Sequence, residues 1–227
     1  MIYRLGELFC GPGGIAWGAM NADIGIPDFR IVHQWANDYD ADTCNTYRHN
    51  ICPDAPETVY HEDIRKFDMS HLAPIDALAF GFPCNDYSVV GEQKGMNGVY
   101  GPLYSYGVKA LKMFKPIWFL AENVGGLKNA NDGKAFTKII AELKGAGYTV
   151  VPHLYKFEEY GIPQARHRII IVGIRNDIDV VYHVPSTALY ADVDNSCRTA
   201  IEVPPIPQNA FNNERTKQSP QVVERLT

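Results

Sequence analysis

Two residues with catalytic chemistry follow apolar segments that have the composition of buried strands. Cys84 comes shortly after the run 75–80, and Glu122 directly follows the run 117–121. In a parallel α/β sheet the carboxyl ends of the strands meet at one edge, where ligands bind. A thiolate is a nucleophile and a carboxyl group can exchange a proton, so the pair predicts covalent catalysis. Alone, the cysteine would be explained as a small buried hydrophobe and the glutamate as a solvated or ion-paired side chain.

Polar side chains that could bind an anion or a base carbonyl precede another apolar segment. The sequence Gln164-x-Arg166-x-Arg168 leads into the run 168–174. Alternate residues of a strand point to the same side, so the two arginines are expected to share a face. A guanidinium group fits a phosphate or a carbonyl oxygen. Taken alone, this pattern would be explained by a cationic surface strand.

A glycine-rich turn near the N-terminus has the spacing of a nucleotide-binding loop. Gly11, Gly13 and Ala16 form the pattern Gly-x-Gly-x-x-Ala between an apolar segment and a helical one. Glycines permit a tight turn close to a ligand, and a helix N-terminus offers free N–H groups. Asp38 follows the second strand candidate, where a carboxylate can bind ribose hydroxyls. The pattern suits NAD and S-adenosylmethionine equally, and a tight turn without a ligand would also explain the glycines.

The segments around these residues alternate between strand and helix. Strands are expected at 4–10, 30–36, 75–80, 117–121, 148–155 and 168–174, and helices from Gly14 to Met20 and at 40–49, 103–114 and 135–144. Continuous apolar runs such as 75–80 are typical of central strands in a parallel sheet covered on both faces. The order predicts an α/β fold with a mostly parallel, doubly wound sheet and helices on both faces.

The composition restricts the function classes. The 227 residues carry 26 acidic and 21 basic side chains, a net charge of −5 that excludes a strongly basic nucleic-acid coat. No apolar run reaches the roughly 18 residues of a membrane span, and the first residues lack the layout of a secretory signal. Five cysteines without framework spacing indicate reduced thiols and a cytoplasmic protein. The seven histidines show no zinc-binding spacing, so no metal is expected.

Five sequence blocks, in order, resemble those of the DNA (cytosine-5)-methyltransferases. The blocks are LFCGPGG at Leu8–Gly14, AND at Ala36–Asp38, EDI at Glu62–Ile64, FGFPCNDYS at Phe80–Ser88 with ENV at Glu122–Val124, and GIPQARHR at Gly161–Arg168. Their joint order and spacing are far more specific than any one block. The resemblance implies a Rossmann-like methyltransferase fold, a bacterial restriction-modification enzyme and transfer of a methyl group to C5 of cytosine in double-stranded DNA.

The resemblance also assigns a cofactor site. The cofactor would be S-adenosylmethionine, released as S-adenosylhomocysteine, with Asp38 on its ribose, Tyr39 stacking near the adenine and Asp63 with Ile64 at the adenine edge. Pro83 and Leu103 would border the sulfonium end. The remaining residues implied to line the cofactor are Phe9, Gly11, Gly13, Gly14 and Ile15.

The catalytic roles come from the same resemblance. Cys84 would add to C6 of a flipped-out cytosine, Glu122 would bind the ring nitrogen N3, and Arg168 would clamp the base. Thiolate addition makes C5 an enamine carbon that can attack a methyl sulfonium. The residues implied to support the catalytic loop are Asn85, Ser88, Gln164 and Arg166. Residues 85–99 would form a lid over the base.

Two features depart from the family pattern. Asn85 stands where the family usually has glutamine, a shorter amide with the same donor and acceptor. Residues 1–184 would be the catalytic domain, and the proline-punctuated stretch 185–227 a linker towards a target recognition domain. That domain and a last cofactor block are expected on a second chain or a further C-terminal region. Apolar surface is expected to lie exposed where the last helix would dock.

Three other functions stay open at this point. The glycine loop alone would allow an NAD-dependent oxidoreductase, against which the Cys84, Glu122 and Arg168 set counts. The same fold could serve as a non-catalytic or regulatory module. An RNA cytosine-5 methyltransferase would keep the chemistry, but the resembling RNA enzymes carry a Cys-Phe-Thr motif that this sequence lacks.

Overall fold

The computed structural model describes residues 1–83, 103–129 and 132–193, which fall into two compact units. The first unit comprises Met1–Tyr155 with His167–Pro185. The second comprises Lys156–Arg166 with Ser186–Thr227, of which residues 156–166 and 186–193 are described. The expected domain division at residue 184 stays a prediction.

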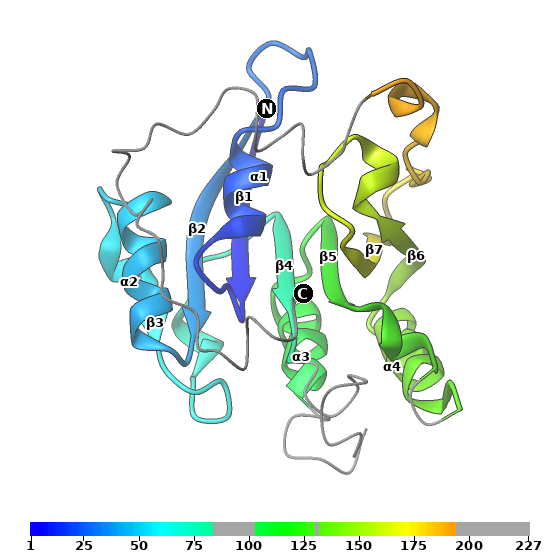
Figure 1. The fold of residues 1–227 in the computed structure, drawn as a ribbon. Coiled ribbons are helices and arrows are strands. Elements are labelled where there is room, and N and C mark those ends of the chain that lie inside the picture. Colours follow the sequence, from blue (N-terminus) through cyan, green and yellow to red (C-terminus); the bar gives the residue numbers. More distant parts are fainter. Residues whose placement is uncertain (84–102, 130–131, 194–227) are drawn as a thin grey trace, which may run out of the picture. The chain divides into compact units, whose positions relative to one another are not determined.

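A seven-stranded sheet forms the centre of the first unit (Figure 1). Its strands follow the spatial order β3-β2-β1-β4-β5-β7-β6. Their bounds are β1 Ile2–Leu8, β2 Arg30–Asp38, β3 Val59–His61, β4 Ala77–Gly81, β5 Trp118–Val124, β6 Tyr148–Lys156 and β7 His167–Arg175. The pairs β1–β2, β1–β4, β2–β3 and β4–β5 are parallel, while β5 and β7 are antiparallel. The parallel pairs bring the carboxyl ends of β1 to β5 to one edge of the sheet.

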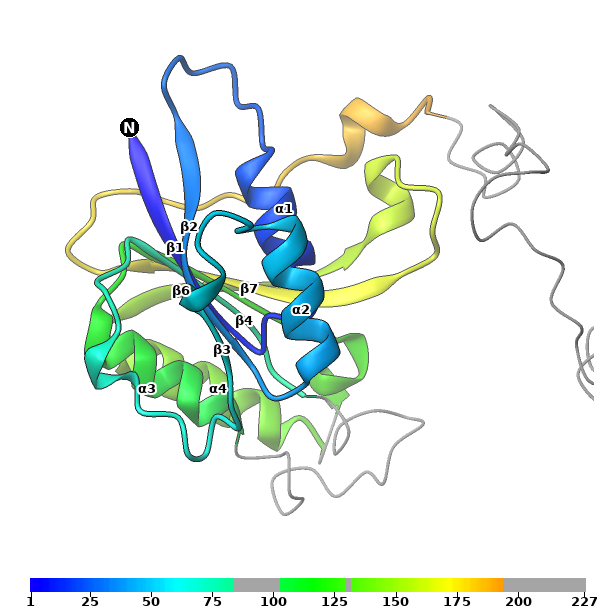
Figure 2. The same cartoon turned by 90° about the vertical axis from the view of Figure 1, so that its left-hand side faces the viewer.

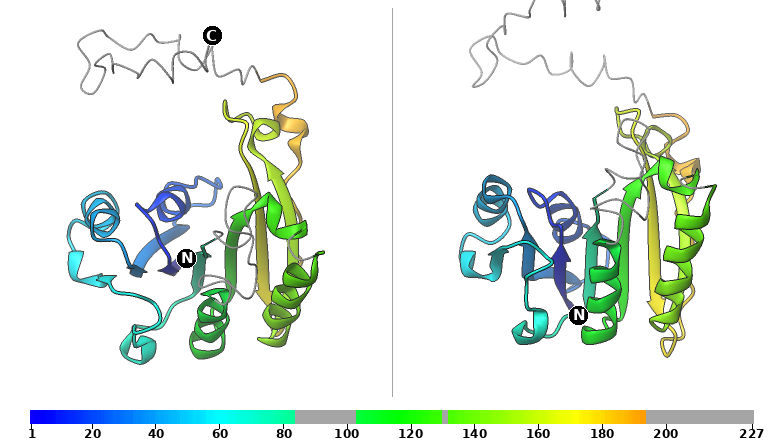
Figure 3. Two further views of the ribbon diagram at one scale, coloured as in Figure 1. Left: turned by 60° about the horizontal axis from the view of Figure 1, so that its bottom comes forward. Right: turned by 90° about the horizontal axis from the view of Figure 1, so that it is seen from below.

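The α-helices of the described residues cover the two faces of this sheet (Figure 2). Their bounds are α1 Gly14–Met20, α2 Ala41–Asn50, α3 Tyr104–Phe114 and α4 Lys134–Gly145. Helices α1 and α2 lie on one face, and α3 and α4 lie side by side on the other (Figure 3). None of the helices within the described ranges is long and apolar enough to cross a membrane.

Each face has its own hydrophobic core. Leu5, Ala16 and Tyr47 belong to the core beneath α1 and α2. Phe80 and Phe119 belong to the larger core beneath α3 and α4. Strand β4 contributes to both cores because its residues are buried on either side, which explains its continuous apolar sequence.

One face of the β5–β7 pair is less covered. Along β5, buried residues alternate with half-buried ones, and Leu120 and Glu122 are among the half-buried set that points away from α3 and α4. Val172 and Ile170 are their partners on β7 and are also half-buried. Apolar side chains on this face are therefore only partly removed from water.

The described part of the second unit is small. It holds two short 3-10 helices, Phe157–Tyr160 and Thr187–Tyr190. The ring centroids of Tyr160 and Tyr190 lie 6.2 Å apart. Gly161 follows the first of these helices with a φ of 76°, a conformation that favours glycine.

The structure confirms the predicted fold class and the strands and helices expected from the sequence, with bounds that differ by a few residues. No strand was expected at Val59–His61, because three residues are too few to show the alternating hydrophobicity of a strand. The stretch 194–227, within the expected linker, lies outside the described residues.

Two helical glycines should respond in opposite ways to alanine. A Cβ at Gly107 in α3 would lie 2.5 Å from Cε2 of the buried Phe80, whereas a Cβ at Gly18 in α1 would meet nothing within 4 Å. We expect Gly107→Ala to lower the free energy of unfolding by about 1–3 kcal/mol through overpacking. Gly18→Ala should raise it by about 0.5–1 kcal/mol through helix propensity. Urea denaturation measures both, and a stabilising Gly107→Ala would contradict the described packing of α3 on β4.

Candidate active site

The glycine-rich turn connects β1 to α1 through residues in the left-handed region. Phe9, Gly11 and Gly13 have φ values of 54°, 56° and 96°. At Gly13 a side chain is excluded by space as well, because a Cβ would lie 2.6 Å from Cγ1 of Ile51. Phe9 is a non-glycine residue in this region, so its backbone is strained. Such strain is typical of functional loops. The backbone of this turn is thus fixed by the residues packed under it.

Asp38 holds the turn from the end of β2. Its Oδ2 accepts the N–H of Gly11 at 2.9 Å, and its Oδ1 accepts the N–H of Asp40 at 3.1 Å. The residue is only 8% exposed. Each carboxylate oxygen can accept a further hydrogen bond. The role expected for Asp38 on a ribose stays a prediction, and in the structure its hydrogen bonds go to the loop.

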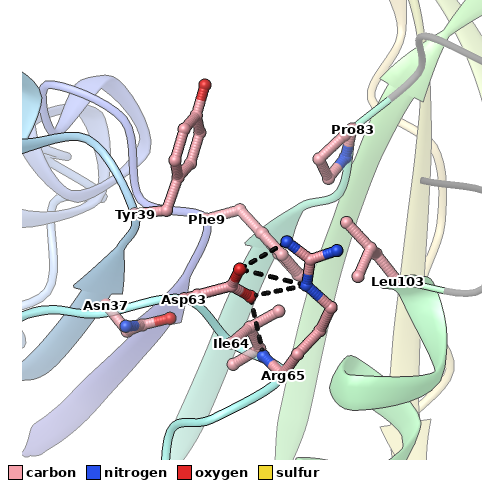
Figure 4. A pocket seen from close by; sticks show the side chains of 8 residues that line it. All are labelled: Phe9, Asn37, Tyr39, Asp63, Ile64, Arg65, Pro83 and Leu103. Carbon is pink, nitrogen blue, oxygen red and sulfur yellow. Dashed lines mark hydrogen bonds and ion pairs between the residues drawn. The ribbon is translucent and has the colours of Figure 1, made fainter. Parts of the chain in front are cut away.

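A pocket lies where the strands end (Figure 4). Its lining consists of Phe9, Asn37, Tyr39, Asp63, Ile64, Arg65, Pro83 and Leu103. The structure therefore brings together six residues of the expected cofactor set, from Phe9 to Leu103, and adds Asn37 and Arg65. The lining includes the apolar side chains of Phe9, Ile64 and Leu103, while Asp63 and Asn37 supply polar groups.

The other expected cofactor residues are not part of this lining. Gly13 and Gly14 line a separate hollow with Trp17 and Ile51. Gly11 and Ile15 belong to the turn and to the first helical residues beside it. The contacts expected between these residues and a cofactor stay predictions.

Asp63 is engaged by its neighbour Arg65 in the pocket lining. Its Oδ1 accepts the backbone N–H of Arg65 at 3.0 Å, and the Arg65 Nε lies 2.9 and 3.0 Å from the two carboxylate oxygens. The Nη2 of Arg65 also bonds to Oδ2. These hydrogen bonds lower the pKa of Asp63 to about 2. The group is a carboxylate at neutral pH, and its role at an adenine edge stays a prediction.

Asn37 lines the same pocket from the end of β2, beside Asp63 (Figure 4). Its Nδ2 donates to the carbonyls of Tyr60 and Glu62 at 3.0 and 2.9 Å, and the residue is 1% exposed. It thereby holds the chain that leads from β3 to Asp63. No role was expected for Asn37 from the sequence. An asparagine at the end of an apolar strand nevertheless indicates a buried side chain that needs hydrogen-bond partners.

Glu122 and Arg168 form an ion pair across β5 and β7. Arg168 Nε lies 2.8 Å from Oε1 of Glu122, and the two side chains are 22% and 27% exposed respectively. Glu122 pairs in register with Gly81 of β4, and a Cβ at Gly81 would lie 3.4 Å from Oε2. The carboxylate therefore lies between the ends of β4 and β7. The sequence placed Glu122 at this edge, and the family resemblance assigned Arg168 to the same base.

The chain that leads to Cys84 is held by Asn123. Its Nδ2 donates to the carbonyl of Phe82 at 2.9 Å, and its Oδ1 accepts the N–H of Val124 at 2.8 Å. Asn123 is 1% exposed. It connects the end of β5 to the end of β4, a role that the sequence analysis missed. Cys84 itself lies outside the described residues, as do Asn85 and Ser88.

Gln164 and Arg166 belong to the second unit, and both side chains are exposed. The backbone N–H of Arg166 donates to the carbonyl of Gln164 at 2.8 Å, and its carbonyl accepts the N–H of Phe157 at 3.1 Å. Strand β7 begins at His167. The expectation that Arg166 and Arg168 share a strand face was wrong at Arg166, because that residue precedes the strand in a tight turn.

The described residues contain no cluster of metal-ligating side chains. Within residues 1–83, 103–129 and 132–193, no three His, Cys, Asp or Glu side chains gather as metal ligands would. The cysteines Cys10, Cys44 and Cys52 are buried and unpaired by disulfides. Burial raises the pKa of the Cys10 thiol. The nucleophile that the sequence predicts is therefore none of these three.

Comparisons with known proteins place the chain among methyltransferases. Residues 3–226 match the family model described as C-5 cytosine-specific DNA methylase. The chain is 54% identical to the Type II methyltransferase M.BbvI of Brevibacillus brevis, over 100% of this chain and 63% of that protein. It is 34% identical to the Type II methyltransferase M.NgoFVII of Neisseria gonorrhoeae, over 93% of this chain and 55% of that protein. The chain thus spans less than two thirds of each relative.

A solved structure shares the fold. The Dnmt2 methyltransferase of S. pombe superposes with a TM-score of 0.57 over 95% of this chain and 58% of that one. The sequences are 15% identical, so the likeness concerns the fold alone.

The Asp63–Arg65 pair gives a titration test. Because the folded-state pKa of Asp63 lies near 2, below its ordinary value of 3.8, its contribution to stability is present above pH 4 and is lost as the pH falls through 2. We expect Arg65→Gln to bring the pKa of Asp63 back towards the ordinary value, with Lys66→Gln, which removes only a weaker electrostatic contribution, as the control that raises it less. Carboxyl-carbon NMR of Asp63 measures both variants. A pKa that stays near 2 in Arg65→Gln would show that the arginine is not its cause.

Proposed function

The chain belongs to the C-5 cytosine-specific DNA methylases, and from this we propose that it is the catalytic part of an enzyme that methylates C5 of cytosine in double-stranded DNA. The methyl donor of this proposal is S-adenosylmethionine. The names of the relatives support a modification enzyme of a bacterial restriction-modification system, acting in the cytoplasm.

The ion pair between Glu122 and Arg168 carries the proposal. It lies at the carboxyl edge of the sheet, next to the end of β4 from which the chain continues to Cys84. A carboxyl group and a guanidinium group so placed can bind the polar edge of a cytosine, the carboxyl group at N3 and the guanidinium at the carbonyl oxygen. An oxidoreductase site has no need of this pair together with a cysteine.

The pocket residues fit the cofactor. Phe9 and Ile64 offer aromatic and apolar surface for an adenine ring, Asn37 and Asp63 add polar groups around it, and Leu103 lies beside the sulfonium end in this proposal. Pro83 lines the same pocket and directly precedes Cys84, so the pocket reaches the chain segment that carries the expected nucleophile. S-adenosylmethionine, when bound, supplies an electrophilic methyl group.

The chain's own residues account for the proton and electron movements. The Cys84 thiolate forms a bond to C6, and the electron pair of the C5–C6 double bond is delocalised towards N3, which takes a proton from the carboxyl group of Glu122. S-adenosylmethionine, when bound, would supply the methyl group to C5 and leave as S-adenosylhomocysteine. Loss of the C5 proton to a base, return of the N3 proton to Glu122 and breakage of the C6–S bond would then restore the C5–C6 double bond and the thiolate. Arg168 holds Glu122 in place and balances charge at the base edge.

The remainder of the enzyme is part of the proposal. Because the chain spans 63% of M.BbvI and 55% of M.NgoFVII, we propose that sequence recognition and the last cofactor contacts reside in a second chain or a further region. A net charge of −5 supports this division, since DNA affinity comes largely from cations on phosphates. Family membership supports DNA over RNA as the substrate, and a catalytic over a regulatory role is supported by the intact Glu122–Arg168 pair.

Removing the nucleophile should abolish turnover. We expect Cys84→Ser, in the full-length protein that contains this chain, to lower methyl transfer on the order of 10³-fold or more and to leave S-adenosylhomocysteine binding unchanged. Cys52→Ser, a buried cysteine away from the pocket, is the control and should stay active. Transfer of tritiated methyl groups to DNA measures both. Full turnover by Cys84→Ser would sink the covalent mechanism.

Glu122 should be required for methyl transfer because it gives a proton to N3 of the cytosine. Glu122→Gln keeps the size of the side chain but cannot give a proton to N3, so methyl transfer should fall by about 10²–10⁴-fold. Glu142→Gln on α4 is the matched control, because its Oε1 accepts a hydrogen bond from Tyr104, which an amide oxygen also can do, and the only ion pair lost among the described contacts is the exposed one with Lys138 at 3.9 Å. The same methyl-transfer assay applies, and equal rates for the two variants would contradict the assigned role.

A further inference from the structure

A buried acid lies beneath the glycine-rich turn and has no place in the chemistry above. Glu7 is the penultimate residue of β1, is 1% exposed, and its carboxyl group contacts Tyr47 of α2. Burying a carboxyl group is costly unless it is hydrogen-bonded. Burial raises the pKa of Glu7 to about 7, and hydrogen bonds from Tyr47 and the backbone of Ala16 oppose this rise. The contacts of Glu7 are therefore the reason that it is tolerated there.

These contacts reach both sides of the turn. The Tyr47 hydroxyl in α2 lies 2.5 Å from Oε2 of Glu7, and the Ala16 backbone hydrogen-bonds the same carboxyl group at the start of α1. The Tyr47 ring also packs under the turn, since a Cβ at Gly13 would lie 3.1 Å from its Cδ2. Asp38 holds the other side through the N–H of Gly11. The turn between Gly11 and Ala16 is thus held by a carboxyl group at each end.

The hydrogen bonds continue away from the turn. Tyr47 Oη lies 3.1 Å from Nδ1 of His33, and Nε2 of His33 lies 2.7 Å from Oγ1 of Thr58. The Thr58 hydroxyl in turn donates to the carbonyl of Ala55 at 2.6 Å. Burial lowers the pKa of His33 to about 4, so its ring is neutral at neutral pH. Glu7, Tyr47, His33 and Thr58 therefore form one continuous chain of hydrogen bonds.

The hydroxyl proton of Tyr47 goes to Glu7, because Tyr47 Oη donates to Oε2. Thr58 likewise gives its hydroxyl proton to the carbonyl of Ala55. His33 lies between these two hydroxyl groups through its two ring nitrogens. A glutamine at position 7 can accept the Tyr47 hydrogen bond through its amide oxygen, so Glu7→Gln keeps this contact.

We infer that Glu7 is a positioning residue for the cofactor: with Tyr47 it fixes the turn from Gly11 to Ala16 in the conformation that binds S-adenosylmethionine, and His33 and Thr58 hold Tyr47 in place. This inference rests on the function proposed above. Glu7 acts through the backbone of the turn and is not part of the pocket lining. Its replacement should therefore change the affinity for the cofactor more than the rate of methyl transfer at saturation.

The test uses Glu7→Leu, Glu7→Gln and Tyr47→Phe, with Leu5→Ala as the matched control. Leu5 lies on the same face of β1 and in the same core, so its truncation destabilises the fold without touching the turn. Two quantities are measured: the dissociation constant of S-adenosylhomocysteine by calorimetry, and the amide hydrogen exchange of Ala16 relative to Phe119 in β5. The second needs no ligand.

We expect Glu7→Leu to weaken binding about tenfold, equivalent to about 1.4 kcal/mol, and to speed Ala16 exchange by a similar factor. Glu7→Gln should stay within about threefold of wild type in both, because it keeps a donor and an acceptor. Tyr47→Phe keeps the ring under Gly13 and should show an intermediate loss in both quantities. It provides the test if Glu7→Leu does not fold. Leu5→Ala should leave both quantities unchanged once corrected for the folded fraction.

Two results separate the possible failures. Wild-type affinity and exchange in both Tyr47→Phe and Glu7→Leu, or losses in Leu5→Ala equal to theirs, would overturn the positioning role. A wild-type chain that binds no S-adenosylhomocysteine would instead count against the proposed function, and the exchange of Ala16 would still decide whether Glu7 fixes the turn.

Discussion

The parallel pairing of β1 with β2 and β4, and of β4 with β5, is the constraint on which the rest of the molecule depends. Because these strands run in one direction, each loop that follows one of them emerges at the same edge. The turn with Phe9, the acid Asp38, the chain from Phe82 to Cys84 and the carboxylate of Glu122 all come from this edge. A fold that supplies neighbouring strand ends needs only suitable loops to assemble a site.

The four buried polar residues of the described chain show how those loops are fixed. Glu7, Asn37, Asp38 and Asn123 all lie in the last residues of β1, β2 or β5. Each uses its side chain to hold backbone next to the site: Asn123 holds Phe82, Asn37 holds the segment before Asp63, and Asp38 holds Gly11. A buried polar group without a partner is costly, so each of these contacts favours a single loop conformation. The rigidity of the site comes from the sheet through these side chains.

The sequence predicts the architecture well because the apolar runs are long and their order is specific. Runs such as 75–80 and 117–121 gave both the strands and the edge at which Glu122 lies. The supporting contacts were harder to predict, since the partners of Asn37 and Asn123 are backbone carbonyls that come close only in three dimensions. Local sequence also could not show that Arg65 engages Asp63 in the pocket, because that contact depends on a turn of a few residues.

The position of β7 between β5 and β6 has a consequence for the nascent chain. Strand β6 precedes β7 in sequence but lies beyond it in the sheet, so the sheet cannot extend past β5 until residues 167–175 have been synthesised. During vectorial synthesis the N-terminal strands can pair while the ribosome is still adding later residues. The partner of Glu122 arrives with β7, since Arg168 is its second residue. The Glu122–Arg168 pair therefore forms only after β7 has been synthesised. By that time the parallel strands β1 to β5 can already have assembled.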